Sequence, residues 1–224
     1  MIAIIPARSG SKRIKDKNIR LLGGKPLMQW AVDTAKQCPS IHRIILSTDS
    51  NDYIRLASGW GIDPVLRPPG MAQDDSTDVL VLGHILQTLG DDSGEFFIYL
   101  RPTTPFRNAK NIENAIEMLL NARERPTGLR SVELMGESSF KGFMRVDNYL
   151  RPILWHGDDL TDQPNQACPQ TWKANGYVDI ARVSEVRAGR LWGNRVIGFV
   201  TPHTVEIDDE EDFKYARWIL GEES

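Results

Sequence analysis

Apolar positions divide the first half of the chain into short strand-like runs and longer segments of helical periodicity. The short runs suit strands, several of them buried on both faces, at 2–5, 42–47, 65–66 and 95–100. Between the runs, apolar residues recur every three or four positions, as on the buried face of a helix, at 26–35, 52–58, 77–89 and 108–120. Because strands and helices alternate with short connections, the pattern predicts a parallel sheet covered on both faces.

The pattern changes after Pro126. Residues 149–171 hold few periodic positions but three prolines, and such an excursion from a compact domain is often an interface. We therefore expect one domain, 1–224, in which 127–174 forms an extension that packs against a second subunit; a disordered loop is the alternative. Further strands are predicted at 128–134, 140–146, 175–180, 195–200 and 204–208.

Composition narrows the class of protein. With 224 residues, 41% hydrophobic and 25% charged, the chain has the size and balance of one globular α/β domain. Its net charge of −3 disfavours general nucleic-acid binding. Cys38 and Cys168 form neither a disulfide framework nor a zinc motif. No apolar run approaches the length of a membrane span, so a cytoplasmic enzyme without a membrane partner is expected.

A basic, flexible loop follows the first strand. It contains five Lys or Arg side chains between positions 8 and 17, together with small and hydroxyl residues. Gly10 lets backbone N–H groups approach phosphate oxygens, Arg8 can bind two such oxygens, and Lys12 and Lys17 add point charges. A solvated basic loop is the alternative, but the carboxyl end of a parallel strand is where ligands bind. The candidate nucleotide-binding residues of this loop are Ala7, Arg8, Ser9, Gly10, Ser11, Lys12 and Asn18.

Two familiar phosphate motifs are absent from the sequence. It contains no G-x-x-x-x-G-K-[ST], and no G-x-G-x-x-G follows the first strand. Neither a P-loop NTPase nor a dinucleotide-binding fingerprint is therefore supported.

A second loop, 101–107, leaves the same end of the predicted sheet. Two prolines bracket Thr103 and Thr104, and an arginine stands at each end of the segment. The segment is either a rigid connection to the next helix or a ligand contact.

Two late carboxylates, Glu206 and Asp208, can share a cation. If 204–208 is a strand, alternation sends both side chains to one face. Magnesium takes one or two carboxylates together with substrate phosphates. The alternative is that Asp208 or Asp209 caps the last helix; metal binding by Asp208 and capping by Asp209 are compatible.

Seven ordered motifs resemble the acylneuraminate cytidylyltransferases, a family similar to CMP-sialic acid synthetase. They are IPARSGSK at 5–12, KN at 17–18, ILSTD at 45–49, LRP at 66–68, LRPTTP at 100–105, NG at 175–176 and EID at 206–208. The resemblance implies a doubly wound, mostly parallel nucleotidyltransferase (Rossmann-like) fold and a homodimer in which the extension reaches the partner's sugar site. It also implies a reaction of CTP with a 2-keto sugar acid that gives the CMP-sugar and pyrophosphate.

The same resemblance assigns roles to individual residues. Arg8, Lys12, Lys17 and Asp208 would be catalytic, Arg67 would contact the nucleotide, and Glu206 with Asp208 would bind Mg²⁺. The residues implied for the sugar side are Arg101, Thr103, Thr104, Lys141, Asn165, Lys173 and Asn175.

The chain departs from the family pattern at two of these positions. Arg101 stands where many relatives have Gln, and Asn165 stands where a relative's arginine would meet the sugar carboxylate, which leaves Lys141 and Lys173 as carboxylate partners. We hypothesise from these departures that the substrate is a phosphorylated or otherwise modified nonulosonic acid, since Arg101 would present an added positive charge.

Two alternatives stay open from the sequence. A related nucleotidyltransferase would use another NTP or a sugar 1-phosphate, because a phosphate loop does not read the base. A non-catalytic nucleotide-binding protein could have the same fold. No histidine lies in the motifs, so no general base is assigned.

Overall fold

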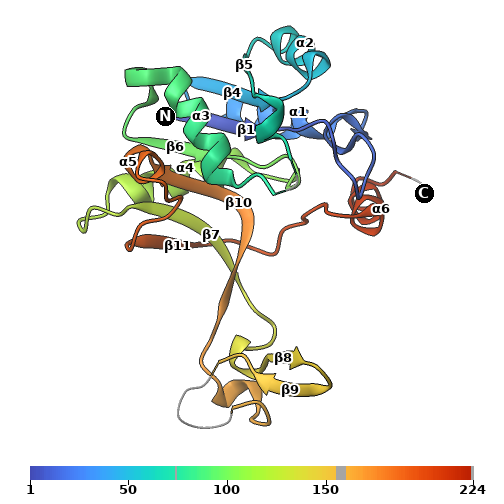
Figure 1. Cartoon of the computed structure of the whole chain (residues 1–224), viewed down its shortest axis with the longest axis vertical. Helices are drawn as coiled ribbons and strands as arrows, with labels where there is room; N and C mark the ends of the chain where they lie inside the picture. Colours follow the sequence, from blue (N-terminus) through green and yellow to red (C-terminus); the bar gives the residue numbers. More distant parts are fainter. Residues whose placement is uncertain (74, 155–159, 223–224) are drawn as a thin grey trace.

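The computed structural model describes residues 1–73, 75–154 and 160–222 as a central sheet with helices on both faces and a small projecting extension (Figure 1). From one edge to the other, the strands of the main sheet are β11 (Val196–Val200), β7 (Gly128–Leu134), β10 (Trp172–Arg182), β6 (Phe96–Tyr99), β1 (Ile2–Pro6), β4 (Arg43–Thr48) and β5 (Asp63–Leu66). β10 is antiparallel to β6 and β7, and the other neighbouring pairs are parallel. The predicted mostly parallel sheet is confirmed.

The strand order reverses beside β1. From β1 the chain passes outward to β4 and β5, and then crosses to β6 on the other side of β1. Loops on the two sides of such a reversal diverge, so a crevice opens at the carboxyl ends of these strands. This is the end from which the basic loop leaves.

The predicted helices in the first half are confirmed to within about two residues, which is the usual uncertainty of helix ends. The side chains of Thr77 and Asn108 accept hydrogen bonds from the first turns of α3 and α4, as expected of N-caps. The helices are α1 (Leu27–Lys36), α2 (Asn51–Gly59), α3 (Asp78–Leu89), α4 (Ala109–Leu120), α5 (Val183–Arg187) and α6 (Glu210–Ile219), and the 3-10 turns are η1 (Lys17–Ile19), η2 (Pro69–Met71), η3 (Gly90–Ser93), η4 (Ser139–Lys141) and η5 (Asn165–Ala167).

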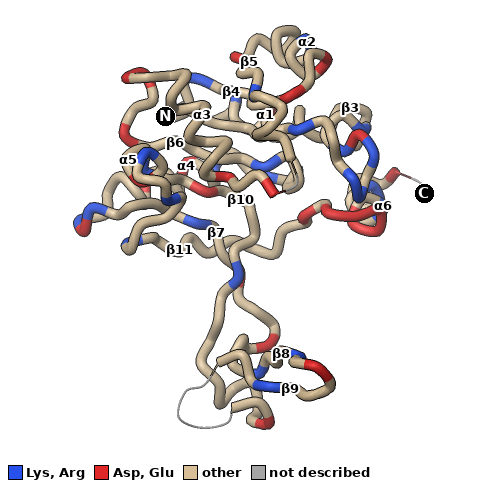
Figure 2. The backbone as a smooth tube through the Cα atoms, viewed as in Figure 1, with Lys and Arg blue, Asp and Glu red and all other residues tan. Residues whose placement is uncertain are grey.

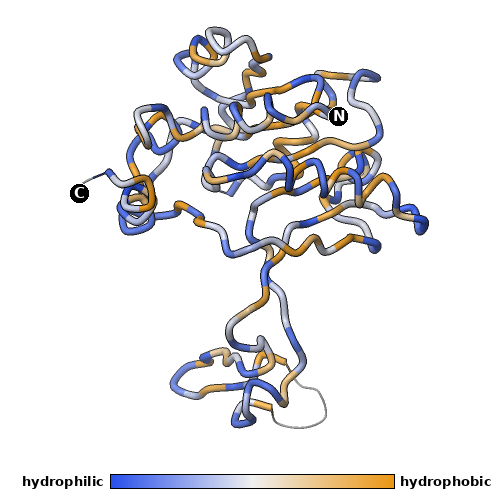
Figure 3. Tube along the Cα trace, turned by 180° about the vertical axis from the view of Figure 1, so that it is seen from behind, coloured by the Kyte–Doolittle hydropathy of each residue, from blue (hydrophilic) through white to orange (hydrophobic). Residues whose placement is uncertain are grey.

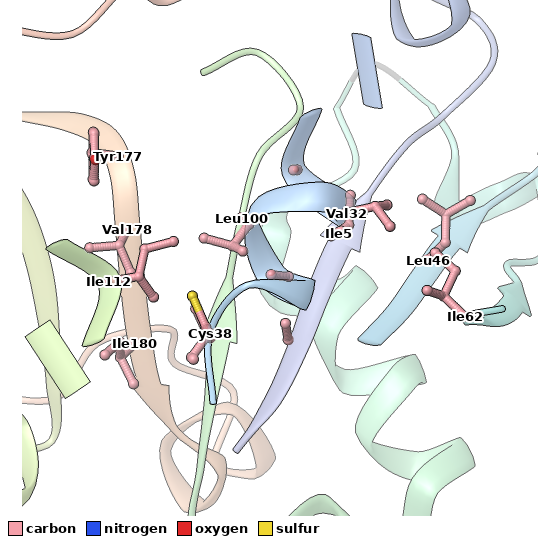
Figure 4. Packing of buried hydrophobic residues seen from close by; sticks show 14 of the residues in the cluster. Ile5, Val32, Cys38, Leu46, Ile62, Leu100, Ile112, Tyr177, Val178 and Ile180 are labelled. Atoms are coloured by element: carbon pink, nitrogen blue, oxygen red, sulfur yellow. The ribbon is translucent and has the colours of Figure 1, made fainter. Parts of the chain in front are cut away.

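Alternation along the strands builds one core on each face of the sheet. On one face, Ile5 of β1 belongs to a cluster with Val32 of α1 and Ile112 of α4 (Figure 4). On the other face, Ile4 of β1 belongs to a cluster with Leu82 of α3. Because both faces are covered, apolar residues fill consecutive positions of β1.

A third apolar cluster joins the two ends of the chain. Three of its residues lie in the basic loop, after it, or at the start of α1, and three lie at or near α6: Ile14, Leu22, Leu27, Ile207, Phe213 and Ala216. All six are at most 1% exposed. Phe106, from the loop after β6, packs against this cluster and meets Trp30 edge-on at 5.5 Å. The third cluster therefore holds three loop segments together at the carboxyl edge of the sheet.

Two of the predicted strands differ from the structure. Residues 204–208 form no strand; instead, the Ile207 N–H donates to the Thr103 carbonyl at 2.8 Å while its side chain enters the third cluster. The predicted strand at 140–146 starts later, as β8 (Phe143–Val146), because η4 takes the preceding residues. Apolar alternation appears in both segments, but in the first it reflects a single anchored side chain rather than sheet pairing.

The extension stands on the ends of β7 and β10 (Figure 1). It carries the hairpin of β8 with β9 (Tyr149–Pro152), whereas a second small hairpin, β2 (Leu21–Leu22) with β3 (Lys25–Pro26), lies near α1. Since β7 pairs with β11 inside the main sheet, the range 127–174 begins within that sheet. Residues 155–159 of the range lie outside the described residues. Every helix among the described residues is too short or too polar to cross a lipid bilayer.

Two isoleucines near the carboxyl end allow a matched test of the third cluster. We expect Ile207→Ala to lower the free energy of unfolding by about 2–5 kcal/mol, since it leaves a cavity in a fully buried cluster. Ile219→Ala, at a position 42% exposed, should cost less than about 1 kcal/mol. Urea denaturation measures both, and equal losses would contradict the assigned role of Ile207.

Candidate active site

A pocket of about 570 Å³ opens at the carboxyl ends of β1, β5 and β6. Residues from the basic loop, from the segment after β5, from the start of α3 and from the loop after β6 line it. The predicted site residues among them are Arg8, Ser11, Lys12, Lys17, Asn18, Arg67, Arg101, Thr103 and Asp208. Segments far apart in the sequence thus meet in one cavity, with the basic loop beside the acidic start of α6 (Figure 2).

Hydrogen bonds at its base fix the start of the basic loop. The Ser9 N–H and hydroxyl donate to the two oxygens of Asp49, at 2.8 and 3.0 Å. The Asn18 amide donates to the Arg8 carbonyl at 2.8 Å, and the Ala7 N–H to the Ser47 carbonyl at 2.8 Å. Gly10 is exposed at the tip of the loop. The two ends of the loop are therefore tied down, while Arg8, Lys12, Arg13 and Lys17 line the pocket.

Lys17 and Asp208 meet at the pocket wall. The Lys17 ammonium lies 3.6 Å from the Asp208 carboxylate and donates to the Ile207 carbonyl at 3.0 Å. Arg13 lies 3.6 Å from the other Asp208 oxygen. Burial lowers the pKa of Lys17, and the charge of Asp208 opposes this effect. The Asp208 side chain is 48% exposed, so a ligand can reach it.

The negative charge of Asp208 acts on Glu206. Partial burial, followed by the negative charge of Asp208, raises the pKa of Glu206, whereas Arg101 and Lys17 act against the rise. A Cβ atom at Gly176 would lie 3.8 Å from a Glu206 oxygen and 3.3 Å from the Thr104 hydroxyl, and Gly176 has a φ of +65°. Glycine at this bulge in β10 thus permits the close approach of both side chains.

The donor set fits a hard divalent cation that is only partly held by protein. Among the described residues no group of three or more His, Cys, Asp or Glu side chains forms a metal site. Burial, followed by the charge of Asp208, raises the pKa of Glu206, and Mg²⁺ uses one or two such carboxylates when substrate phosphates complete its coordination. The residues present therefore fit such an ion together with a phosphate ligand.

Arg67 presents a second cation from deep in the pocket wall. It is 5% exposed and donates to the Ser47 carbonyl at 2.7 Å. Its Nε atom is buried without a hydrogen-bond partner. Burial lowers the pKa of Arg67, and the charges of Tyr99 and Asp49 oppose this. A buried, incompletely bonded guanidinium is suited to a ligand with acceptor atoms.

Arg107 organises the loop after β6. Its guanidinium donates to four carbonyl oxygens, those of Arg101, Thr104, Gly176 and Tyr177. The hydroxyls of Thr103 and Thr104 are buried without partners. The segment is therefore a rigid connection that also lines the pocket through Thr103, and its contact with a ligand stays a prediction.

Arg101 does not present a free charge. It donates to Asp179 at 2.5 Å and to Asp78 at 2.8 Å, and its guanidinium carbon lies 4.7 Å from the centre of the Tyr99 ring. Burial disfavours its charge, but the two carboxylates and Tyr99 raise the pKa of Arg101. The hypothesis of a phosphorylated sugar assumed an added, available positive charge here, so the structure corrects that assumption.

The other residues implied for the sugar side lie outside this pocket. Lys173 pairs with Glu133 at 2.8 Å on the neighbouring strand, and Asn175 is buried on β10 with a hydrogen bond to Thr201 at 2.6 Å. Lys141 and Asn165 lie in the extension. Lys141 pairs there with Glu137 at 3.3 Å, and Asn165 bonds the backbone of Ser138 and Gly136. The single chain does not bring these four residues into the pocket.

Sequence reasoning missed three acidic residues that position the site. Asp49 holds the basic loop, and Asp78 and Asp179 hold Arg101. Asp179 carried a usable signal, because it is a lone charge inside an apolar strand, and a buried charge needs a partner. Asp49 ends the ILSTD motif after a strand at the ligand-binding edge, but the motif assigned it no role. Asp78 looked like an ordinary acidic residue in the first turn of a helix.

Comparison with known proteins gives consistent matches. A family model described as cytidylyltransferase matches residues 2–147. An N-acylneuraminate cytidylyltransferase of Escherichia coli is 38% identical over 96% of this chain and 51% of its own length. A CMP-N,N'-diacetyllegionaminic acid synthase of Legionella pneumophila is 31% identical over 83% of this chain and 79% of its own. The chain thus spans about half the length of the E. coli relative.

A solved structure shares the fold. The CMP:2-keto-3-deoxy-manno-octonic acid synthetase complexed with CTP superposes with a TM-score of 0.74 over 98% of both chains, at 14% identity. At this identity the likeness concerns the arrangement of elements only.

The raised pKa of Glu206 can be tested directly. ¹³C NMR titration of the carboxyl carbon should place it above 4.5, and Asp208→Asn should lower it, because a repelling charge is removed. On acidification Glu206 should therefore take up a proton, and lose its ability to bind a cation, at a higher pH than an ordinary glutamate. Glu211→Gln, on the exposed surface of α6, is the control. If Asp208→Asn left the pKa of Glu206 unchanged, the two carboxylates would not interact as assigned.

Proposed function

The chain belongs to the cytidylyltransferase family, and from this premise we propose that it joins CTP to a sialic-acid-like 2-keto sugar acid, giving the CMP-sugar and pyrophosphate. One observation carries the proposal: the pocket at the carboxyl edge combines a tied-down cationic loop with Asp208, beside Glu206. Two relatives whose names state transfer to such sugar acids support the substrate class.

The cationic loop would bind the triphosphate and stabilise the leaving group. In the proposed reaction the sugar's anomeric hydroxyl oxygen bonds to the α-phosphorus, the bond from that phosphorus to the pyrophosphate oxygen breaks, and the hydroxyl proton departs. Negative charge grows on the pyrophosphate, so Arg8, Lys12 and Lys17 would stabilise the transition state. Arg67 would contact the nucleotide from the deep wall. Positioning and charge stabilisation supply most of the rate in such transfers.

Glu206 and Asp208 would hold Mg²⁺ against the phosphates. When bound, the ion would polarise phosphate oxygens and help to orient the two substrates. The 3.6 Å contacts of Asp208 with Arg13 and Lys17 are longer than hydrogen bonds. Phosphate groups that attract these two cations would leave the carboxylate available to the metal.

The sugar would lie beyond the α-phosphate, between Thr103 and the bulge at Gly176. Lys141 and Asn165 lie in the extension and do not line the pocket of their own chain, so in this proposal they reach the sugar site of another copy. Large apolar side chains are exposed there, as expected of an interface: Phe143, Met144, Tyr149, Leu150, Ile153 and Leu154. Figure 3 shows apolar segments in this lobe as well as in the strands of the main sheet. We therefore propose a homodimer in which each extension completes the partner's site.

Pyrophosphate release with Mg²⁺ tests the reaction. We expect release from CTP with a nonulosonic acid such as N-acetylneuraminate, and much less from GTP, UTP or sugar 1-phosphates. Absence of release with every nucleotide and sugar would instead support a non-catalytic nucleotide-binding protein.

Neighbouring carboxylates separate metal binding from helix capping. We expect Asp208→Ala to abolish turnover while the circular dichroism spectrum and melting temperature stay close to those of the parent. Asp209 caps α6 by accepting from Glu211 and Asp212 N–H groups at 3.0 Å. Asp209→Ala should therefore cost about 1 kcal/mol of stability and retain turnover. Near-normal turnover of the Asp208 variant with Mg²⁺ would remove the metal assignment.

Lys141→Ala should raise the KM for the sugar and leave the KM for CTP unchanged. If the extension serves the partner's site, mixing this variant with Asp208→Ala should restore activity. Random exchange makes half of the dimers mixed, and each mixed dimer has one site with neither defect. At a sugar concentration far below the KM of the Lys141 variant, about a quarter of parental activity therefore returns. Lack of complementation in a verified mixed dimer would place Lys141 in its own chain's site or outside both sites.

A further inference from the structure

Arg101 is held on three sides at the wall of the pocket. Behind it lies Asp179, which is 2% exposed, and beside it lies Asp78 at the start of α3. The Tyr99 ring, also 2% exposed, stacks against the guanidinium. The remaining side faces the pocket, which both Arg101 and Asp78 line. A fixed guanidinium therefore presents its remaining N–H groups to whatever fills this part of the cavity.

Both oxygens of Asp78 are engaged. One accepts from Arg101 at 2.8 Å, and the other accepts from the Tyr99 hydroxyl at 2.8 Å. Burial, followed by the charge of Asp78, raises the pKa of Tyr99 well above its usual value, so the hydroxyl remains a donor. Two donors thus fix the position of the Asp78 carboxylate, although its side chain is 40% exposed.

Within the cluster of Arg101, Asp78, Asp179 and Arg130, the two positive and two negative charges balance. Arg130 lies 3.5 Å from the Asp179 oxygen that Arg101 leaves free, so two guanidinium groups face two carboxylates. An anionic group placed against Arg101 would lose its hydration and would also be repelled by the Asp78 carboxylate. A hydroxyl or an amide carbonyl would gain a hydrogen bond without that repulsion.

We infer that Asp78 determines specificity: by pairing with Arg101 it makes this wall of the pocket select an uncharged substituent of the sugar and reject a second anion. The inference rests on the proposed function and concerns the part of the substrate that lies beyond the transferred phosphate. Asp78 acts through Arg101, so it is a positioning residue rather than a catalytic one. The structure thereby favours a sugar acid whose carboxylate is its only anionic group over the phosphorylated one that Arg101 alone suggested.

Paired sugar analogues separate charge from bulk. Pyrophosphate release is measured for N-acetylneuraminate carrying either an acetyl or a sulfate group on the same hydroxyl, at position 4 and separately at position 9. For each pair, the ratio of kcat/KM for the sulfate to that for the acetate reports the response to negative charge, because both groups are larger than hydrogen. The parent protein should disfavour the sulfate in at least one pair by about tenfold or more.

Asp78→Asn keeps an oxygen acceptor for Tyr99 but releases the charge of Arg101. We expect it to raise the sulfate-to-acetate ratio about tenfold in the disfavoured pair, through KM for the sugar rather than through kcat. Asp78→Glu should return the ratio toward the parent value. The control is Asp63→Asn, which breaks another arginine–aspartate pair, with Arg43 at 2.6 Å, at the amino ends of β4 and the edge strand β5.

The outcomes distinguish the inference from the proposed function. Pyrophosphate release by the parent with ratios that Asp78→Asn leaves within twofold would overturn the inference alone, provided that the variant melts near the parent temperature. A parent that prefers the sulfates would also overturn it. No release with any sugar acid would overturn the proposed function, and the inference with it. A shift caused equally by Asp63→Asn would show that the effect is not specific to Arg101.

Discussion

Burial of six apolar side chains from opposite ends of the chain is the constraint on which the site depends. Ile14, Leu22 and Leu27 have no reason to lie near Ile207 and Phe213 except that together they exclude water. Their association brings the basic loop to the two late carboxylates and, through Phe106, to the loop after β6. The sheet provides the edge on which these loops stand, but the third cluster closes them into one pocket.

The charged side chains in and around the pocket fall into two groups. One group is satisfied internally: Asp49 holds Ser9, Arg107 binds four carbonyls, and Arg101 is paired with Asp78 and Asp179. The other group has long contacts or partial exposure, as in Lys17 and Arg13 against Asp208. The first group fixes geometry because buried charges with good partners are costly to move. The second group can exchange its partners for a polyphosphate and a metal ion at little cost.

Local patterns in the sequence predicted the sheet, the first-half helices and most of the pocket, since each depends on neighbouring residues or on strands that end at one edge. The predicted strand at 204–208 was wrong because alternation around Ile207 serves a long-range cluster that no local pattern reveals. For the same reason Arg101 was taken for a free charge: Asp78 and Asp179 lie 23 and 78 positions away in sequence. Contacts between segments distant in the sequence were therefore what the sequence did not predict.

A crystal structure with CTP and Mn²⁺ in place of Mg²⁺ tests the central claim most directly, since the anomalous signal locates the metal independently of any assignment. The account predicts one manganese ion within about 2–2.5 Å of oxygens from Glu206, Asp208 and a phosphate, with the triphosphate contacting Arg8, Lys12 and Lys17. A triphosphate bound away from the basic loop, or manganese bound to neither carboxylate, would contradict it.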